Sequence, residues 1–255
     1  MDYKKKFPIF SNIESHYLDT AATAQKPKVV LDKVVEYYEN DNGNPGRGSD
    51  VYKRQVLDIN LVGEYNLYNV LGCVASIVSL GINVEFIVEK LKHMSSVPGR
   101  FETIKNNLGA RIVVDFAHTD DGLLNVGETL KDITENRVIT VFGAGGDRDH
   151  DKRPKMAKAA AKFSDLIILT SDNPRTENPT DILNQIEEGL TEINFSKDKY
   201  TVIEDREEAI KYAIENILSK GDSLLIAGKG HETYQIIGKE KKHFDDREMA
   251  RKYCK

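Results

Sequence analysis

Hydrophobic residues between positions 111 and 228 recur in short, evenly spaced runs. Runs rich in β-branched residues predict strands at 111–116, 137–142, 165–170, 200–204 and 223–228. Nearly every position in them is apolar, which is typical of strands covered on both faces. The intervening segments carry helical spacing, most clearly at Ile210, Ala213, Ile214, Ile217 and Leu218. Alternating strands and helices predict an α/β fold with a mostly parallel, doubly wound sheet.

Amphipathic patterns upstream of this region predict further helices. Segments 66–80 and 84–94 each have an apolar face, formed in the first by Val70, Val74 and Val78. A Pro/Gly break at 95–100 is typical of a junction between domains. Another helix is predicted at 28–39, and the periodicity of neither side continues between 48 and 61. The 255 residues are long enough for one or two domains.

Charge and composition narrow the class of protein. The chain has 36 Lys and Arg residues against 41 Asp and Glu, a net charge of −5, which argues against nucleic-acid and anionic-membrane partners. No apolar run approaches the ~20 residues of a spanning helix, and the N-terminus lacks a signal-peptide pattern. Cys73 and Cys254 are too few and too distant for a disulfide framework or a metal site. We therefore expect a cytoplasmic protein.

Polar loops follow each predicted strand, at 115–121, 143–154, 170–179, 204–205 and 227–235. Such loops gather at the carboxyl ends of the strands in a parallel sheet. They carry cationic or potentially cationic groups at His118, Arg148, Arg153, Arg175, Lys229 and His231, and anionic groups at Asp115, Asp147, Asp172 and Glu232. Any one loop is equally well explained as a solvated turn. Five together favour a site for a zwitterionic or phosphate-bearing small molecule.

Two glycine-rich strings resemble nucleotide motifs only superficially. GAGGDR at 143–148 has Arg148 where the third glycine of a dinucleotide fingerprint would stand. In AGKGHE at 227–232, Lys229 precedes Gly230 rather than Ser or Thr, so this string is not a Walker A motif. The sequence therefore encodes no recognisable cradle for ATP phosphates.

Seven sequence motifs occur in this chain in the same order as in a known protein family. They are GEYNLYN (63–69), PGRFE (98–102), VDFAHT (114–119), GAGGDRDHDKRPKM (143–156), TSDNPRTENP (170–179), AGKGHETYQ (227–235) and FDDRE (244–248). From Gly63 onward, roughly three-quarters of the chain, the sequence resembles the diaminopimelate-adding branch of the Mur ligase family. The resemblance implies a Rossmann-like C-terminal domain at 99–255, preceded at 61–98 by a remnant of the family's central ATPase domain.

The resemblance implies an ATP-dependent, ADP-forming amide ligation in peptidoglycan synthesis. Its implied small-molecule partners are ATP with Mg²⁺, UDP-MurNAc-L-Ala-D-Glu and meso-diaminopimelate, with no nucleic acid or membrane partner and an undetermined oligomeric state. The P-loop, the phosphate and metal sites and the UDP-sugar domain of the family have no match in this sequence. Phosphoryl transfer depends on positioning by those parts, so we expect the chain to be inactive by itself. A non-catalytic diaminopimelate-binding domain is the alternative.

The family's ligand positions map onto individual residues here. The implied diaminopimelate site comprises Arg148, Asp172, Asn173, Pro174, Arg175, Gly228 and Glu232. Diaminopimelate differs from lysine by a second carboxylate, which a guanidinium can bind with paired hydrogen bonds, and Glu232 suits an ammonium group. The implied adenosine site comprises Asn69, Arg100, Asp115 and, with a less defined role, His118.

Three features qualify this assignment. Taken alone, Asp172 and Arg175 also fit a helix-capping turn with an exposed arginine. For Lys229, phosphate contact and solvent exposure are both open. Asp120 stands where relatives usually carry proline, a change that removes no ligand.

The first fifty residues resemble a different family. YLDTAATAQKP (17–27) and NGNPGRG (42–48) are similar to the N-terminal arm of class V aminotransferase-type cysteine desulfurases. The Schiff-base lysine and phosphate cup that hold pyridoxal phosphate in that family are absent, so we do not expect PLP, and desulfurase activity is the least favoured alternative.

VYKRQ (51–55), which begins the junction at 51–60, matches neither family, and this suggests a chimeric sequence produced by assembly or cloning. Continuous sequencing of genomic DNA across codons 48–60 tests this hypothesis, and an intact fusion there would contradict it.

Overall fold

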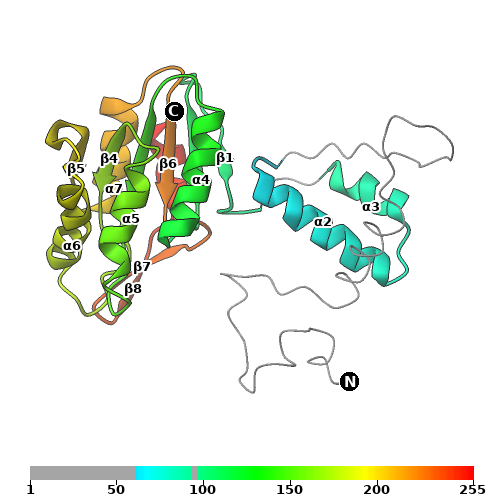
Figure 1. Cartoon of the computed structure of the whole chain (residues 1–255), viewed down its shortest axis with the longest axis horizontal. Helices are drawn as coiled ribbons and strands as arrows, with labels where there is room; N and C mark the ends of the chain where they lie inside the picture. The colour runs from blue at the N-terminus through cyan, green and yellow to red at the C-terminus, as the bar shows by residue number, and fades with distance from the viewer. Residues whose placement is uncertain (1–60, 94–96) are drawn as a thin grey trace. The chain divides into compact units, whose positions relative to one another are not determined.

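The computed structural model describes residues 61–93 and 97–255. The chain divides into two compact units, residues 1–95 and 96–255, and each is described by itself (Figure 1). The N-terminal segment 1–50, its predicted helix at 28–39 and the junction at 51–60 lie outside the described residues.

In the first unit, the two predicted helices form with slightly different ends. They are α2 (Glu64–Ser79) and α3 (Val84–Leu91), and the Asn83 side chain caps α3 by accepting the Glu85 N–H at 2.7 Å. Val70 is buried in a small core with residues of α3. Val78 was predicted on the same face but is 40% exposed. Steps of four residues advance 40° around a helix, so Val78 has turned away while Ile77 packs against the core.

The second unit is built on a six-stranded sheet with the order β1-β2-β6-β3-β4-β5. Its strands are β1 (Glu102–Ile104), β2 (Arg111–Asp115), β3 (Val138–Phe142), β4 (Leu166–Leu169), β5 (Tyr200–Val202) and β6 (Ser223–Ala227). The five predicted strands are confirmed and pair in parallel, whereas the short edge strand β1 is antiparallel to β2 and was not predicted. The mostly parallel α/β fold expected from the pattern is therefore present.

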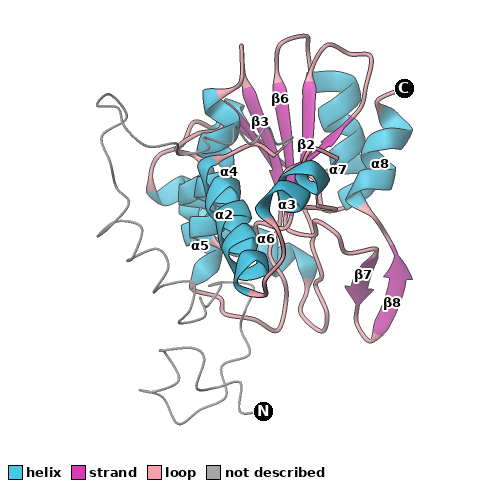
Figure 2. Ribbon diagram, turned by 90° about the vertical axis from the view of Figure 1, so that its right-hand side faces the viewer, coloured by secondary structure: helices cyan, strands magenta, loops and turns pink. Residues whose placement is uncertain are grey.

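Helices cover both faces of this sheet (Figures 1 and 2). One layer contains α4 (Asp120–Asp132), α5 (Lys152–Ala160) and α6 (Pro179–Glu192), and the other contains α7 (Arg206–Tyr212) and α8 (Asp246–Tyr253). Ile112 and Ile226 belong to the core that packs against α7 and α8. Alternate strand residues such as Val113 and Leu225 are also fully buried, because both faces are covered.

Local signals explain how α7 begins and ends. The side chain of Asp205 accepts the Glu208 N–H at 2.9 Å and so caps the amino end of α7. The predicted helical stripe continues beyond α7 as a π-helical turn, Ala213–Ile217, and ends at Leu218, whose backbone is extended. None of the helices in 61–93 and 97–255 is long and apolar enough to cross a membrane.

A β-hairpin that was not predicted follows β6. Its strands, β7 (Tyr234–Ile237) and β8 (Glu240–His243), are antiparallel and form a separate two-stranded sheet. Every residue of β8 is exposed, so its sequence, EKKH, lacks the apolar alternation that would reveal a strand.

Candidate substrate-binding site

A cleft of about 180 Å³ lies in the second unit, beside the carboxyl ends of its central strands. The loops after β2, β3, β4 and β6 line it. Six of the predicted amino-acid-binding residues contribute directly: Arg148, Asp172, Asn173, Arg175, Gly228 and Glu232. Pro174 is not among the lining residues. Its carbonyl packs against Gly146, where an added Cβ would lie 1.9 Å from the oxygen.

Four of the five predicted loops therefore meet at the cleft. The fifth, at 204–205, does not line it. Glu204 accepts the hydroxyl of Thr180 at 2.8 Å, and Asp205 caps α7, so both side chains have structural partners. The expectation that this loop contributes to the site is wrong, because β5 is the far edge strand of the sheet.

Lys229 is completely buried beneath the cleft. Its ammonium donates to the side-chain oxygen of Asn173 at 3.0 Å and to the carbonyl of Tyr234 at 2.8 Å. It also lies 3.1 Å from a carboxylate oxygen of Asp172 and 3.7 Å from one of Glu232. Solvent exposure, one of the two alternatives left open by the sequence, is wrong.

The glycines on either side of Lys229 account for this placement. Gly228 and Gly230 have φ values of 115° and 53°, which side-chain-bearing residues rarely adopt. Two positive-φ residues around a lysine turn the backbone sharply and direct the side chain beneath the loop. Sequence spacing alone does not reveal that direction.

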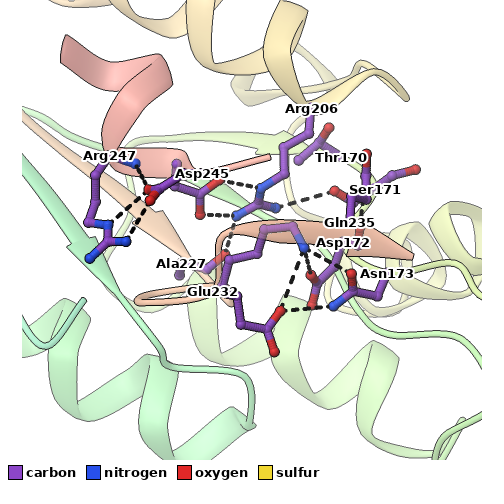
Figure 3. Close-up of polar contacts among 12 residues, drawn as sticks. Thr170, Ser171, Asp172, Asn173, Arg206, Ala227, Glu232, Gln235, Asp245 and Arg247 are labelled. Carbon is purple, nitrogen blue, oxygen red and sulfur yellow. Dashed lines mark hydrogen bonds and ion pairs between the residues drawn. The ribbon is translucent and has the colours of Figure 1, made fainter. Parts of the chain in front are cut away.

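Asn173 joins the loop after β4 to the segment after β6 (Figure 3). Its amide nitrogen donates to Glu232 at 3.0 Å, and its side-chain oxygen accepts the Ile236 N–H at 2.9 Å as well as the Lys229 ammonium. Gln235 adds a hydrogen bond of 2.7 Å to the Asp172 carbonyl. The TSDNPR and GKGHETYQ strings thus form one hydrogen-bonded assembly.

Arg175 is fixed through both its backbone and its side chain. Its φ is +52°, and its N–H donates to the Ile236 carbonyl at 3.0 Å while its own carbonyl accepts the Gly238 N–H at 2.7 Å. The β7–β8 hairpin therefore holds a backbone conformation that is unfavourable for arginine. The guanidinium donates to the Gly146 carbonyl at 2.6 Å and lines the cleft. The alternative of a simple capping turn does not describe these contacts.

Arg153 holds the loop after β3 through hydrogen bonds made on the buried side of that loop. It is fully buried and donates to both carboxylate oxygens of Glu177 at 2.9 Å, to Gln185 at 2.7 Å and to the Gly145 carbonyl at 3.2 Å. Hydrogen bonding from Arg153 lowers the pKa of Glu177 to about 2, with a further contribution from the Asp147 N–H. Arg148, by contrast, is exposed beside the cleft. Of the two arginines, only Arg148 is therefore placed to meet a ligand.

Of the predicted adenosine residues of the second unit, Arg100 and His118 lie against the Phe116 ring, and Asp115 precedes Phe116 in the chain. Both carboxylate oxygens of Asp115 accept backbone N–H groups, from Phe101 and from Ala117, each at 2.7 Å. Burial raises the pKa of Asp115, and these two hydrogen bonds oppose the shift. The Arg100 guanidinium lies 4.8 Å from the Phe116 ring centre.

His118 lines the cleft, with Nδ1 2.8 Å from the Phe116 carbonyl oxygen. The fourth predicted adenosine residue, Asn69, belongs to the other unit and is exposed on α2.

Sequence reasoning missed three charged residues at this site. Lys152 lines the cleft, and burial lowers its pKa while the nearby Asp172 carboxylate opposes the shift. Arg206 and Asp246 form a fully buried ion pair behind the cleft. A signal for Arg206 exists, because it stands three and four residues before the apolar Ala209 and Ile210 and so shares their face of α7.

Within the described residues, no group of three or more His, Cys, Asp or Glu side chains is arranged to bind a metal ion. The two cysteines are free thiols, Cys73 exposed and Cys254 buried.

An open, mostly parallel sheet with helices on both faces and a charged cleft at its strand ends defines a domain of the doubly wound α/β class. Comparison with known families gives a more specific result. The family described as "Mur ligase, glutamate ligase domain" matches residues 99–230, just over half of the chain, and the chain belongs to the Mur ligase family. A second family, "Aminotransferase class-V", matches residues 16–61. The Mur ligase resemblance is therefore confirmed. The second match confirms the class V aminotransferase resemblance but does not test the narrower desulfurase one. It also extends over 51–60, so the expectation that this segment matches neither family is wrong.

Relatives of this chain include several enzymes named UDP-N-acetylmuramoyl-L-alanyl-D-glutamate–2,6-diaminopimelate ligase. The one from Fusobacterium nucleatum is 45% identical over 217 residues, covering 84% of this chain and 44% of the relative. Ligase 2 of Clostridium acetobutylicum is 50% identical over 192 residues, covering 75% and 39%. A solved structure of a ligase of that name aligns with a TM-score of 0.60 at 39% identity, covering 78% and 40%. The chain thus spans about two fifths of the length of these relatives.

Proposed function

We propose that the cleft binds meso-diaminopimelate and that the chain is the amino-acid-binding part of an ATP-dependent ligase of peptidoglycan synthesis. The observation that carries the proposal is the charge arrangement of the cleft. Arg148 and Arg175 offer guanidinium groups, while Asp172 and Glu232 offer carboxylates in the same cavity. Meso-diaminopimelate has two carboxylates and two ammonium groups, so it complements both kinds of charge.

In the proposed reaction, one amine of diaminopimelate forms an amide with the D-glutamate side chain of UDP-MurNAc-L-Ala-D-Glu. ATP with Mg²⁺ supplies the activation by phosphorylating that carboxylate, and the amine then displaces phosphate. The amine must lose a proton before it attacks. The residues of this chain bind and orient the amino acid, which converts an encounter between two molecules into a reaction between positioned groups.

Phosphoryl transfer is not assigned to this chain. The sequence contains no Walker A string, and the described residues include no metal-binding cluster. We infer that Arg100, Asp115 and His118 contribute at most to the adenosine end of ATP. Support for that inference comes from the position of Arg100 and His118 against the Phe116 ring, on which a purine could stack. Asn69 remains a sequence-based proposal for the other unit.

We propose that the reaction takes place in the cytoplasm, because its proposed substrate is linked to a nucleotide. The domain organisation expected from the sequence, with 61–98 as a remnant of the ATPase domain and 99–255 as the C-terminal domain, is part of the same proposal.

Isothermal titration of the full chain with meso-diaminopimelate tests the proposal. L-lysine, which lacks the second carboxylate, is the matched ligand control. We expect saturable binding of diaminopimelate and at least about tenfold weaker binding of lysine, the effect of losing one charge-assisted pair. Absence of saturable binding, or equal affinities for the two amino acids, would overturn the proposal.

A further inference from the structure

Arg206 lies behind the cleft and does not line it. It begins α7, and both it and Asp246 of α8 are completely buried. Nε and Nη2 of Arg206 donate to the two carboxylate oxygens of Asp246 at 2.7 and 2.8 Å. This paired geometry uses only part of the guanidinium's donor capacity.

The remaining donors of Arg206 reach the two principal ligand loops. Nη2 donates to the Ala227 carbonyl at 2.9 Å, and Nη1 donates to the Ser171 carbonyl at 3.3 Å (Figure 3). Ala227 immediately precedes Gly228, and Ser171 immediately precedes Asp172. One rigid, planar group therefore fixes the chain at the point where both ligand loops leave the sheet.

Stability alone does not require a charged pair at positions 206 and 246. A buried ion pair can often be replaced by apolar side chains of similar volume with little loss of stability. Apolar side chains cannot, however, donate hydrogen bonds to the Ala227 and Ser171 carbonyls. The donors to those carbonyls are the part of Arg206 that acts on the cleft.

We propose that Arg206, held by Asp246, is a positioning residue. It fixes the DNPR loop (172–175) and the GKGHE loop (228–232) in their ligand-binding geometry. The inference rests on the proposed function for the identity of the ligand, meso-diaminopimelate. A site whose loops are already ordered loses less conformational entropy on binding, so removing the guanidinium weakens binding without removing any ligand contact.

The test is the charge-neutral double variant Arg206→Met/Asp246→Leu in the full chain. The single Arg206→Met variant would leave a buried, unpaired carboxylate, whereas the double variant removes both charges. We expect a folded protein whose dissociation constant for meso-diaminopimelate is raised about tenfold. Amide hydrogen exchange is expected to accelerate in segments 171–176 and 227–233 specifically.

The matched control is Arg137→Met. Arg137 pairs with the buried Asp222 at 2.7 Å, at the opposite ends of the strands. This variant is expected to lose stability while keeping wild-type affinity and wild-type exchange in both loops. A purely structural role for Arg206 predicts the same pattern for the double variant.

Each outcome decides the proposal. A folded double variant with wild-type affinity and unchanged loop exchange overturns it. If the double variant does not fold, the same two measurements on Arg206→Lys test the proposal. Lysine keeps the positive charge beside Asp246 but lacks the branched guanidinium that donates to both carbonyls. If the wild-type chain does not bind diaminopimelate, the proposed function fails, and loop exchange alone then supports or refutes the positioning role.

Discussion

The Lys229 ammonium lies 3.1 Å from a carboxylate oxygen of Asp172, with the lysine fully buried and the aspartate nearly so. That oxygen, Oδ1, has no hydrogen-bond partner within the described residues, so the ion pair is its main source of stabilisation. A carboxylate oxygen of Glu232 lies 3.7 Å from the same ammonium. One buried cation thus offsets two carboxylates that the proposed function assigns to the ligand.

Substituting Lys229 should be strongly destabilising. In Lys229→Met, Asp172 and Glu232 would remain close together without the cation, and we expect a loss of about 3–5 kcal/mol in the free energy of unfolding. Urea unfolding at pH 7 measures this loss. Lys155→Met, at an exposed position of α5, is the control and should change stability by less than about 0.5 kcal/mol. Equal stabilities for the two variants would contradict the role assigned to Lys229.

The Glu177–Arg153 pair should make stability depend on pH in a defined direction. The pKa of Glu177 is lowered from 4.5 to about 2, so its contribution is fully present above pH 4.5 and is lost as the pH falls toward 2. Glu177→Gln should cost about 1–2 kcal/mol at pH 7, allowing for its partly exposed carboxylate. The difference from wild type should shrink between pH 4.5 and 2 in urea unfolding. A difference that is constant with pH would refute this assignment.

Close packing between two ligand loops makes Gly146 sensitive to substitution. A Cβ there would lie 1.9 Å from the backbone carbonyl oxygen of Pro174, which cannot simply rotate away. Gly146→Ala should therefore destabilise the second unit by about 2–3 kcal/mol and weaken ligand binding. In Gly72→Ala, within α2, the added methyl group meets no atom within 4 Å and should stabilise its helix by up to about 1 kcal/mol. Thermal unfolding distinguishes the two, and a neutral Gly146→Ala would contradict the loop packing described above.

Much of the fold could be predicted because both faces of the sheet are covered. Burial on both sides makes every residue of β3 except Thr140 apolar, and a similar pattern marks the other central strands. The edge strand β1, which is partly exposed, and the hairpin strand β8, which is exposed throughout, escaped prediction because exposure removes that constraint. Val78 was misplaced because a strict four-residue repeat drifts around the helix.

The site residues could be predicted where they belong to contiguous sequence motifs. DNPR and GKGHE are local motifs, so Arg175 and Glu232 could be placed at a common strand edge from topology alone. The inward orientation of Lys229 depends on backbone angles at Gly228 and Gly230, which the sequence does not specify. The Arg206–Asp246 pair joins residues 40 positions apart, so local spacing could not reveal it.

The chain should not catalyse phosphoryl transfer by itself. With ATP, Mg²⁺, UDP-MurNAc-L-Ala-D-Glu and meso-diaminopimelate present, we expect ADP release no faster than from a heat-inactivated sample, because the sequence contains no Walker A string. A coupled assay for ADP measures this directly. Release well above the inactivated control would contradict the proposal that this chain does not carry out phosphoryl transfer by itself.

The most direct test of the central claim is whether Arg175 distinguishes diaminopimelate from lysine. Calorimetric titration of Arg175→Ala with both amino acids measures this discrimination, and Arg111→Ala, at the opposite end of strand β2, is the control. We predict that Arg175→Ala loses the preference for diaminopimelate, with affinity for it falling about tenfold or more and affinity for lysine unchanged, while Arg111→Ala keeps the preference. A preference that survives in Arg175→Ala would contradict the account.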